Sequence, residues 1–171
     1  GLLLQSGNDC AAAIAEHISG SQEAFAELMN TEAKQLGATG THFVNPHGLH
    51  DENHYTTTYD LYLMFNEALK DQAFLDIISM NSYTAKVTSA DGTSYTPTWQ
   101  ATNYYSAGEA TPPDGIHVYG GKTGTTDQAG NCVILYEKNT AGEPYISVIM
   151  GASDKPLLYE EMNELLDAGM K

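Results

Sequence analysis

GGKTGTT, at residues 120–126, is the most informative stretch of this 171-residue sequence. It lies in segment 117–125, which is a candidate β-strand. Gly121 and Gly124 lack a Cβ atom, so they let the backbone of a ligand approach the strand closely. Between them, Lys122 supplies positive charge in a chain whose formal net charge is −15 and which has no arginine. A peptide laid along this strand would add to it through main-chain hydrogen bonds.

The sequence on either side of this stretch predicts further strands, most of them joined as hairpins. Asp91-Gly92 is a strong turn signal between two alternating segments, and Pro97 makes the second of these an edge or irregular strand. The predicted additional strands are 83–88, 95–101, 131–137 and 145–151.

The first third of the chain and its last segment have helical periodicity. Asn8 or Asp9 is the predicted cap of the first helix, Ser21 of the second, and Ser153 or Asp154 of the last. The predicted helices span about 8–20, 21–37, 56–69, 74–78 and 153–169. The layout is α+β, an antiparallel sheet flanked by helices. One domain is expected over 1–171, helical over about 1–80, with strands and a final helix over about 81–171.

Charge and hydropathy exclude several classes of protein. The seven cationic side chains are all lysines and are scattered, whereas a nucleic-acid surface needs them clustered, so no nucleic acid is expected as a partner. No apolar run approaches the roughly 20 residues that a membrane span requires, and no secretory leader is visible.

A second short motif, Ser6-Gly7-Asn8, lies between two predicted helices. Alone, each motif is weak, because S-G-N also reads as a helix cap and K-T-G as a turn at a strand end. Together they match the second and third of the three motifs of penicillin-binding proteins and β-lactamases, which are S-x-x-K, S-x-N and K-T-G. The segments 41–49, 51–55 and 146–152 extend the resemblance, and the chain resembles the low-molecular-mass D-alanyl-D-alanine carboxypeptidases over essentially its whole length.

This resemblance implies a β-lactamase/transpeptidase-like fold and a serine peptidase that works through an acyl-enzyme. Its substrate would be a peptidoglycan stem peptide ending in D-Ala-D-Ala, β-lactams would acylate it, and no cofactor or metal would be needed. The parent protein would act outside the cytoplasm, at the outer face of the membrane or in the periplasm.

The resemblance also implies roles for individual residues. Ser6 would belong to the proton relay, and Asn8 would bind substrate and hold the lysine of the first motif. The backbone N–H of Thr125 would be one oxyanion donor, and Lys155 is a weaker candidate for binding the substrate carboxylate. The implied catalytic residues are Ser6, Asn8 and Lys122, and the implied substrate-binding residues are Lys122, Thr123, Gly124 and Thr125.

The first motif is absent from the sequence, because no serine has a lysine three residues later. The nearest imitation, Thr31-Glu-Ala-Lys34, has the pattern of a solvated helix face. The resemblance puts S-x-x-K, its helix and two sheet strands before Gly1. We therefore expect the isolated chain to be inactive and to expose apolar surface, which the missing N-terminal segment or self-association would cover.

Two other classes of function compete with this interpretation. One loop contains several residues of the types that bind metal ions, and they suggest a metal-binding protein: His47, His50, Asp51, Glu52 and His54. The same loop contains Pro46 and Gly48, which exclude an H-E-x-x-H helix. Alternatively, the chain is a non-catalytic fragment that binds a peptide or a β-lactam reversibly.

Cys10 and Cys132 do not form a disulfide framework or a C-x-x-C motif. Two buried free thiols are expected, with a single bridge as the alternative in an exported protein.

Overall fold

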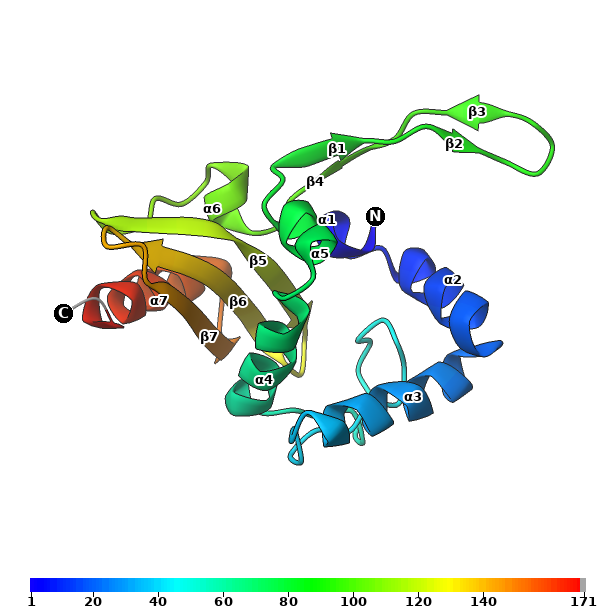
Figure 1. The fold of residues 1–171 in the computed structure, drawn as a ribbon, viewed down its shortest axis with the longest axis horizontal. Helices are drawn as coiled ribbons and strands as arrows, with labels where there is room; N and C mark the ends of the chain where they lie inside the picture. The colour runs from blue at the N-terminus through cyan, green and yellow to red at the C-terminus, as the bar shows by residue number, and fades with distance from the viewer. Residues whose placement is uncertain (170–171) are drawn as a thin grey trace.

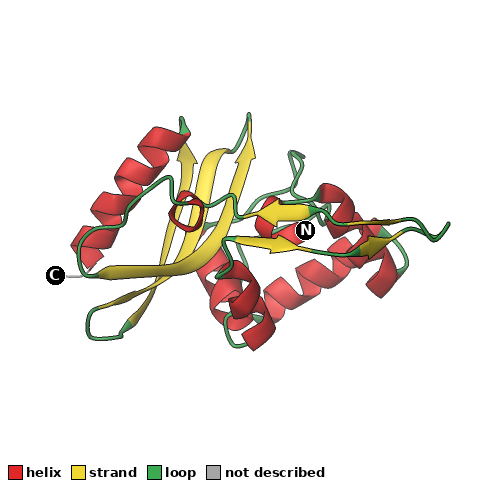
Figure 2. Ribbon diagram, turned by 90° about the horizontal axis from the view of Figure 1, so that it is seen from above, coloured by secondary structure: helices red, strands yellow, loops and turns green. Residues whose placement is uncertain are grey.

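The computed structural model describes residues 1–169, with a three-stranded antiparallel sheet between helices on both of its faces (Figures 1 and 2). The helices are α1 Leu2–Gln5, α2 Asn8–Ser19, α3 Gln22–Gln35, α4 Thr58–Ala68, α5 Gln72–Ile78, α6 Tyr104–Ala107 and α7 Lys155–Gly169. The strands are β1 Ser82–Thr84, β2 Val87–Thr88, β3 Ser94–Tyr95, β4 Thr98–Gln100, β5 Ile116–Thr126, β6 Gly130–Asn139 and β7 Pro144–Ala152. The expected α+β fold is confirmed.

The sheet has the order β5-β6-β7, so β6 is central and β5 lies at one edge. Successive side chains of β6 alternate between the two faces, as the period of a strand requires. Val133 and Leu135 pack into one core with α7, whereas Ile134 packs into a second core with Phe65 of α4 and Ile78 of α5. Helices therefore cover both faces and hold β5 in place as an edge strand.

Helix α7 confirms the prediction for the last helix. Leu158, Met162 and Leu166 are buried, and their spacing of four residues puts them on one helical face. Burying each such side chain stabilises the fold by about 1.5–3 kcal/mol. Of the two candidate caps, Asp154 is the one that accepts a hydrogen bond, from the Leu157 N–H at 2.8 Å.

The cap predicted for the first helix is wrong. Gly7 occupies the N-cap position of α2, and Asn8 is already its first helical residue. The reason is the left-handed backbone of Ser6, whose φ is 57°, which turns the chain so that Gly7 is extended. Asn8 is thereby freed from capping. For α3, the Ser21 hydroxyl accepts from the Ala24 N–H at 3.1 Å, as predicted.

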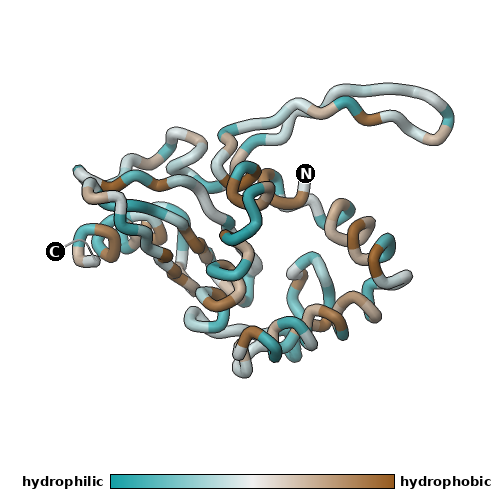
Figure 3. Tube along the Cα trace, viewed as in Figure 1, coloured by the Kyte–Doolittle hydropathy of each residue, from teal (hydrophilic) through white to brown (hydrophobic). Residues whose placement is uncertain are grey.

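Figure 3 shows hydrophobic residues in brown along α2 and α3. Several of these residues are exposed. Ile14 and Ile18 of α2 are 43% and 57% exposed. A groove of about 490 Å³ runs between α3 and α4 and is lined by Phe25, Met29 and Met64 among others. The structure therefore has the exposed apolar surface that the sequence predicts.

A long hairpin arm, formed by residues 82–100, projects from the body (Figure 1). β1 pairs with β4 and β2 with β3, so each predicted strand is broken in two. The break falls at Pro97, whose lack of an N–H interrupts the ladder. Gly92 turns the tip with a φ of +87°, as the Asp91-Gly92 signal predicts. Within residues 1–169, no helix is long and apolar enough to cross a membrane.

Candidate active site

The two sequence motifs meet where the edge strand β5 passes the junction of α1 and α2. The Lys122 ammonium donates a hydrogen bond to the Ser6 hydroxyl, across 116 positions of the sequence. It also donates to the backbone carbonyl of Thr123 at 2.8 Å. Two of the predicted catalytic residues are therefore in direct contact, and the sheet fixes Lys122 while the helix junction fixes Ser6.

Ser6 is held in an unusual backbone conformation. Among residues 1–169 it is the only residue other than glycine with a positive φ. A left-handed backbone costs an ordinary residue about 1–2 kcal/mol, so it persists where the surroundings impose it. Here it ends α1 and points the hydroxyl at Lys122. The local strain is consistent with a functional position.

A cleft of about 510 Å³ opens between β5, the α1–α2 junction and the start of α7. Every predicted site residue lines it, namely Ser6, Asn8, Lys122, Thr123, Gly124, Thr125 and Lys155. Lys155 enters from the first turn of α7, where its ammonium lies 5.4 Å from the centroid of the Tyr104 ring. The predicted site residues thus bring two cations, three hydroxyls and an amide to the cleft.

Burial lowers the pKa of Lys122 below its usual value, because removal from water penalises the charged form. No carboxylate among residues 1–169 forms an ion pair with it. A partly buried cation without an acidic partner favours an anionic ligand, and a lowered pKa makes proton transfer through the Ser6 hydroxyl easier. The electrostatics fit both binding of a carboxylate and proton relay.

The three glycines of β5 differ in what surrounds them and therefore in their structural roles. A Cβ on Gly124 would meet nothing within 4 Å, so Gly124 leaves the cleft open, as expected. A Cβ on Gly121 would lie 2.0 Å from the Ile134 carbonyl oxygen of β6, so this glycine serves strand packing and the expectation that it admits a ligand is wrong. Gly120 follows an irregularity at Val118 and, with a φ of +156°, packs against α5.

Replacing Gly120 with alanine is expected to lower the free energy of unfolding by about 2 kcal/mol. The new methyl group would lie 2.0 Å from the Ile78 carbonyl oxygen, and the backbone is one that only glycine adopts readily. Gly124→Ala is the matched control and should be nearly neutral. Urea unfolding of both variants measures this, and equal stabilities would contradict the packing role of Gly120.

The cleft also contains residues that sequence reasoning missed. Thr102 directly precedes Asn103, the buried cap residue of α6. Its hydroxyl oxygen lies 2.6 Å from that of Thr123, and the two hydroxyls form a hydrogen bond in which either can donate. Cys132 lies opposite Gly124 in the strand register and lines the same cleft. Cys10 and Cys132 are both free and half-buried, so the expected free thiols are present but less buried than predicted, and no bridge joins them.

In the histidine-rich loop, three imidazoles form hydrogen bonds with nearby backbone groups. His54 Nδ1 accepts from the Val44 N–H at 3.2 Å, and His42 Nδ1 lies 2.6 Å from the Asn53 carbonyl oxygen. His47 Nδ1 accepts from its own loop backbone at 3.2 Å. Within residues 1–169, no three His, Cys, Asp or Glu side chains are grouped so that they could hold a metal ion. The geometry gives the metal-binding alternative no support.

Known proteins match this chain over nearly all of its length. D-alanyl-D-alanine carboxypeptidase DacF of Bacillus subtilis is 32% identical over 167 residues, which are 98% of this chain and 40% of the relative. DacA of Haemophilus influenzae is 32% identical over 171 residues, which are 99% of this chain and 40% of the relative. The chain therefore spans about two fifths of these relatives.

Solved structures agree in fold. The crystal structure of the Streptomyces K15 DD-transpeptidase superposes with a TM-score of 0.88 at 27% identity, covering 99% of this chain and 64% of that one. The D-alanyl-D-alanine carboxypeptidase of Mycobacterium tuberculosis superposes with a TM-score of 0.81 at 28% identity, covering 99% of this chain and 61% of that one. The penicillin-binding transpeptidase-like fold is thus confirmed. Because the family model for D-alanyl-D-alanine carboxypeptidase also matches residues 1–154, the chain belongs to the D-alanyl-D-alanine carboxypeptidase family of serine peptidases.

Proposed function

We propose that this chain supplies the substrate-binding strand and the proton relay of a serine-type D-alanyl-D-alanine carboxypeptidase. The enzyme would act on peptidoglycan stem peptides outside the cytoplasm and would be acylated by β-lactams. The observation that carries this proposal is the contact between Lys122 and Ser6, in a cleft also lined by the Thr123 and Thr125 hydroxyls. The names of its relatives support the same activity.

Substrate binding follows from the open edge of β5. A stem peptide would pair with this edge as an additional strand, and Gly124 would leave room for its backbone. Its terminal carboxylate would accept hydrogen bonds from Thr123 and Thr125 and would be attracted by Lys122. Lys155, which also lines the cleft, is a second cation for the same carboxylate.

Catalysis would need a serine that attacks the carbonyl of the penultimate D-alanine. As this serine attacks, its hydroxyl proton would pass into the relay that includes Ser6 and Lys122, and this relay would return a proton to the leaving D-alanine nitrogen as the peptide bond breaks. The serine would retain the acyl group as an ester until water hydrolyses it. Asn8 would hold the peptide and the lysine of the first motif. The Thr125 N–H would stabilise the oxyanion, a contribution of roughly 3–4 kcal/mol for each such donor.

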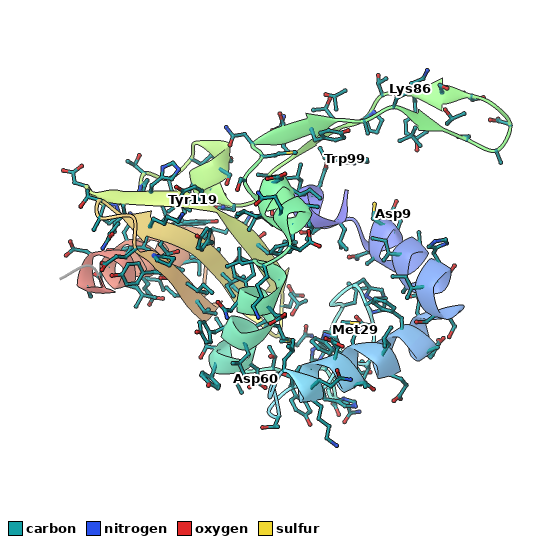
Figure 4. All side chains as sticks on the ribbon, viewed as in Figure 1. Asp9, Met29, Asp60, Lys86, Trp99 and Tyr119 are labelled. Atoms are coloured by element: carbon teal, nitrogen blue, oxygen red, sulfur yellow. The ribbon has the colours of Figure 1, made fainter. Side chains whose placement is uncertain are left out.

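The attacking serine and its lysine would come from a polypeptide segment other than residues 1–171, because no S-x-x-K occurs within them. The apolar groove along α3 is the docking site we propose for that segment. The groove shares Met29 and Phe43 with a smaller pocket, and that pocket also includes Ser6 and Lys122. Figure 4 shows Met29 on the inner side of α3. A helix in this groove would reach the relay pair.

Intact mass spectrometry after incubation with penicillin tests this proposal. The isolated chain should keep its mass, whereas a longer protein that includes the S-x-x-K segment should gain the mass of one drug molecule. Acylation of the isolated chain would contradict the assignment and would make Ser6 the suspected nucleophile. A longer protein that binds penicillin without any gain in mass would instead favour the reversible binding module.

A further inference from the structure

Thr102 contacts both halves of the cleft, although it belongs to neither motif. Its backbone N–H donates to the Leu4 carbonyl oxygen of α1 at 3.2 Å. Its hydroxyl oxygen lies 2.6 Å from the hydroxyl oxygen of Thr123 on β5. Since α1 ends at Ser6, one residue links the segment that carries the S-G-N serine to the strand that carries K-T-G.

The backbone around Thr102 is fixed on both sides. The preceding residue, Ala101, donates its N–H to the Asn81 carbonyl oxygen at 2.9 Å at the base of the arm. The following residue, Asn103, is 2% exposed, and its side-chain oxygen accepts from the Tyr105 N–H at 3.0 Å. The Thr102 hydroxyl therefore sits on a rigid support, and its short contact with Thr123 is a defined feature of the cleft.

The chemistry of a bound carboxylate determines the direction of this hydrogen bond. A hydroxyl has one proton to donate, and an ionised carboxylate can only accept. When Thr123 donates its proton to the carboxylate, it can interact with Thr102 only as an acceptor. Thr102 must then be the donor, and its hydrogen bond polarises the Thr123 hydroxyl toward the ligand.

We propose that Thr102 is a positioning residue that orients the Thr123 hydroxyl as a donor to the C-terminal carboxylate of the ligand. It contributes in this way to the selection of peptides with a free C-terminus. This inference rests on the proposed function, because it needs a carboxylate ligand in the cleft. It adds to that function a specificity-determining residue outside both motifs.

Equilibrium binding to residues 1–171 tests the inference without interference from turnover. The probes are N-acetyl-D-alanyl-D-alanine and its C-terminal amide, followed by NMR titration of the amide signals of β5. Thr102→Val, which replaces the hydroxyl with a methyl group, should weaken binding of the free acid by about 3- to 10-fold. Binding of the C-terminal amide should be unchanged, and Thr102→Ser, which keeps the hydroxyl, should restore the wild-type preference.

A double variant distinguishes a positioning role of Thr102 from a purely structural role. In Thr123→Val, the change at Thr102 should have no further effect on the preference for the free acid, because the group that it orients is gone. Equal losses for acid and amide, or an unchanged preference in Thr102→Val, would overturn the inference while leaving the proposed function standing. Wild-type chain that binds neither probe would overturn the inference, and penicillin acylation of the longer protein would then show whether the proposed function still stands.

Discussion

Replacing Lys122 with methionine is expected to lower the rate of penicillin acylation about 10²- to 10⁴-fold in the longer protein that carries the nucleophile. The substitution keeps an unbranched side chain of similar length but removes the proton donor to Ser6 and the positive charge of the cleft. The free energy of unfolding should not fall, because burial already disfavours the charged ammonium, as its lowered pKa shows. Time-resolved intact mass spectrometry measures the acylation rate.

Lys70→Met is the matched control for this prediction. Lys70 is an exposed lysine outside the cleft, paired with Glu67 on the surface. Its loss removes the same charge from the whole chain but leaves the relay intact, so acylation should proceed at the wild-type rate. If Lys122→Met also acylates at the wild-type rate, the proton reaches the leaving group by another route and the contact with Ser6 is structural.

The long elements of this fold could be predicted because their signals are local. Helix α7 combines a capping aspartate with apolar residues four positions apart, and β6 and β7 are rich in β-branched and aromatic residues. The short helix α6 was missed, because four residues are too few for a helical period. The cap at Asn8 was assigned wrongly because a favourable cap residue reveals nothing about the left-handed turn at Ser6 before it.

The candidate site could be predicted only where motifs carry it. Ser6 and Lys122 were identified from short patterns, and the structure brings them into contact. Thr102 has no such pattern, because its role depends on where the returning strand of the arm meets β5. Gly121 was misread for a similar reason, since only the position of the β6 backbone reveals that a methyl group there would clash. Sequence indicates residue types, whereas close contacts depend on tertiary packing.

Replacing Glu137 with glutamine is expected to stabilise the protein at pH 8 by about 3 kcal/mol. Glu137 is fully buried on β6, and one carboxylate oxygen has no hydrogen-bond partner, while the other accepts from the Ser147 hydroxyl at 2.6 Å. Burial raises its pKa from 4.5 to about 7. Glutamine keeps the shape and the acceptor for Ser147 but cannot ionise, so it avoids the cost of a buried charge.

The sign of the pH dependence follows from proton binding. Between pH 4.5 and about 7, the folded state binds a proton at Glu137 that the unfolded state has released. The stabilisation from this proton is complete below pH 4.5 and is lost as the pH rises through about 7. Urea unfolding should therefore show wild type and Glu137→Gln nearly equal at pH 4.5, with a gap that widens until about pH 8.

Two comparisons identify the buried carboxyl as the cause of this gap. Glu160→Gln removes an exposed carboxylate from α7 and should change the free energy of unfolding by less than about 0.5 kcal/mol at either pH. Tyr105, whose pKa is raised mainly by burial and also by Tyr159 and Glu137, stays neutral throughout this range and does not contribute. A gap between wild type and Glu137→Gln that is the same at both pH values would mean that Glu137 does not change its charge in the folded protein.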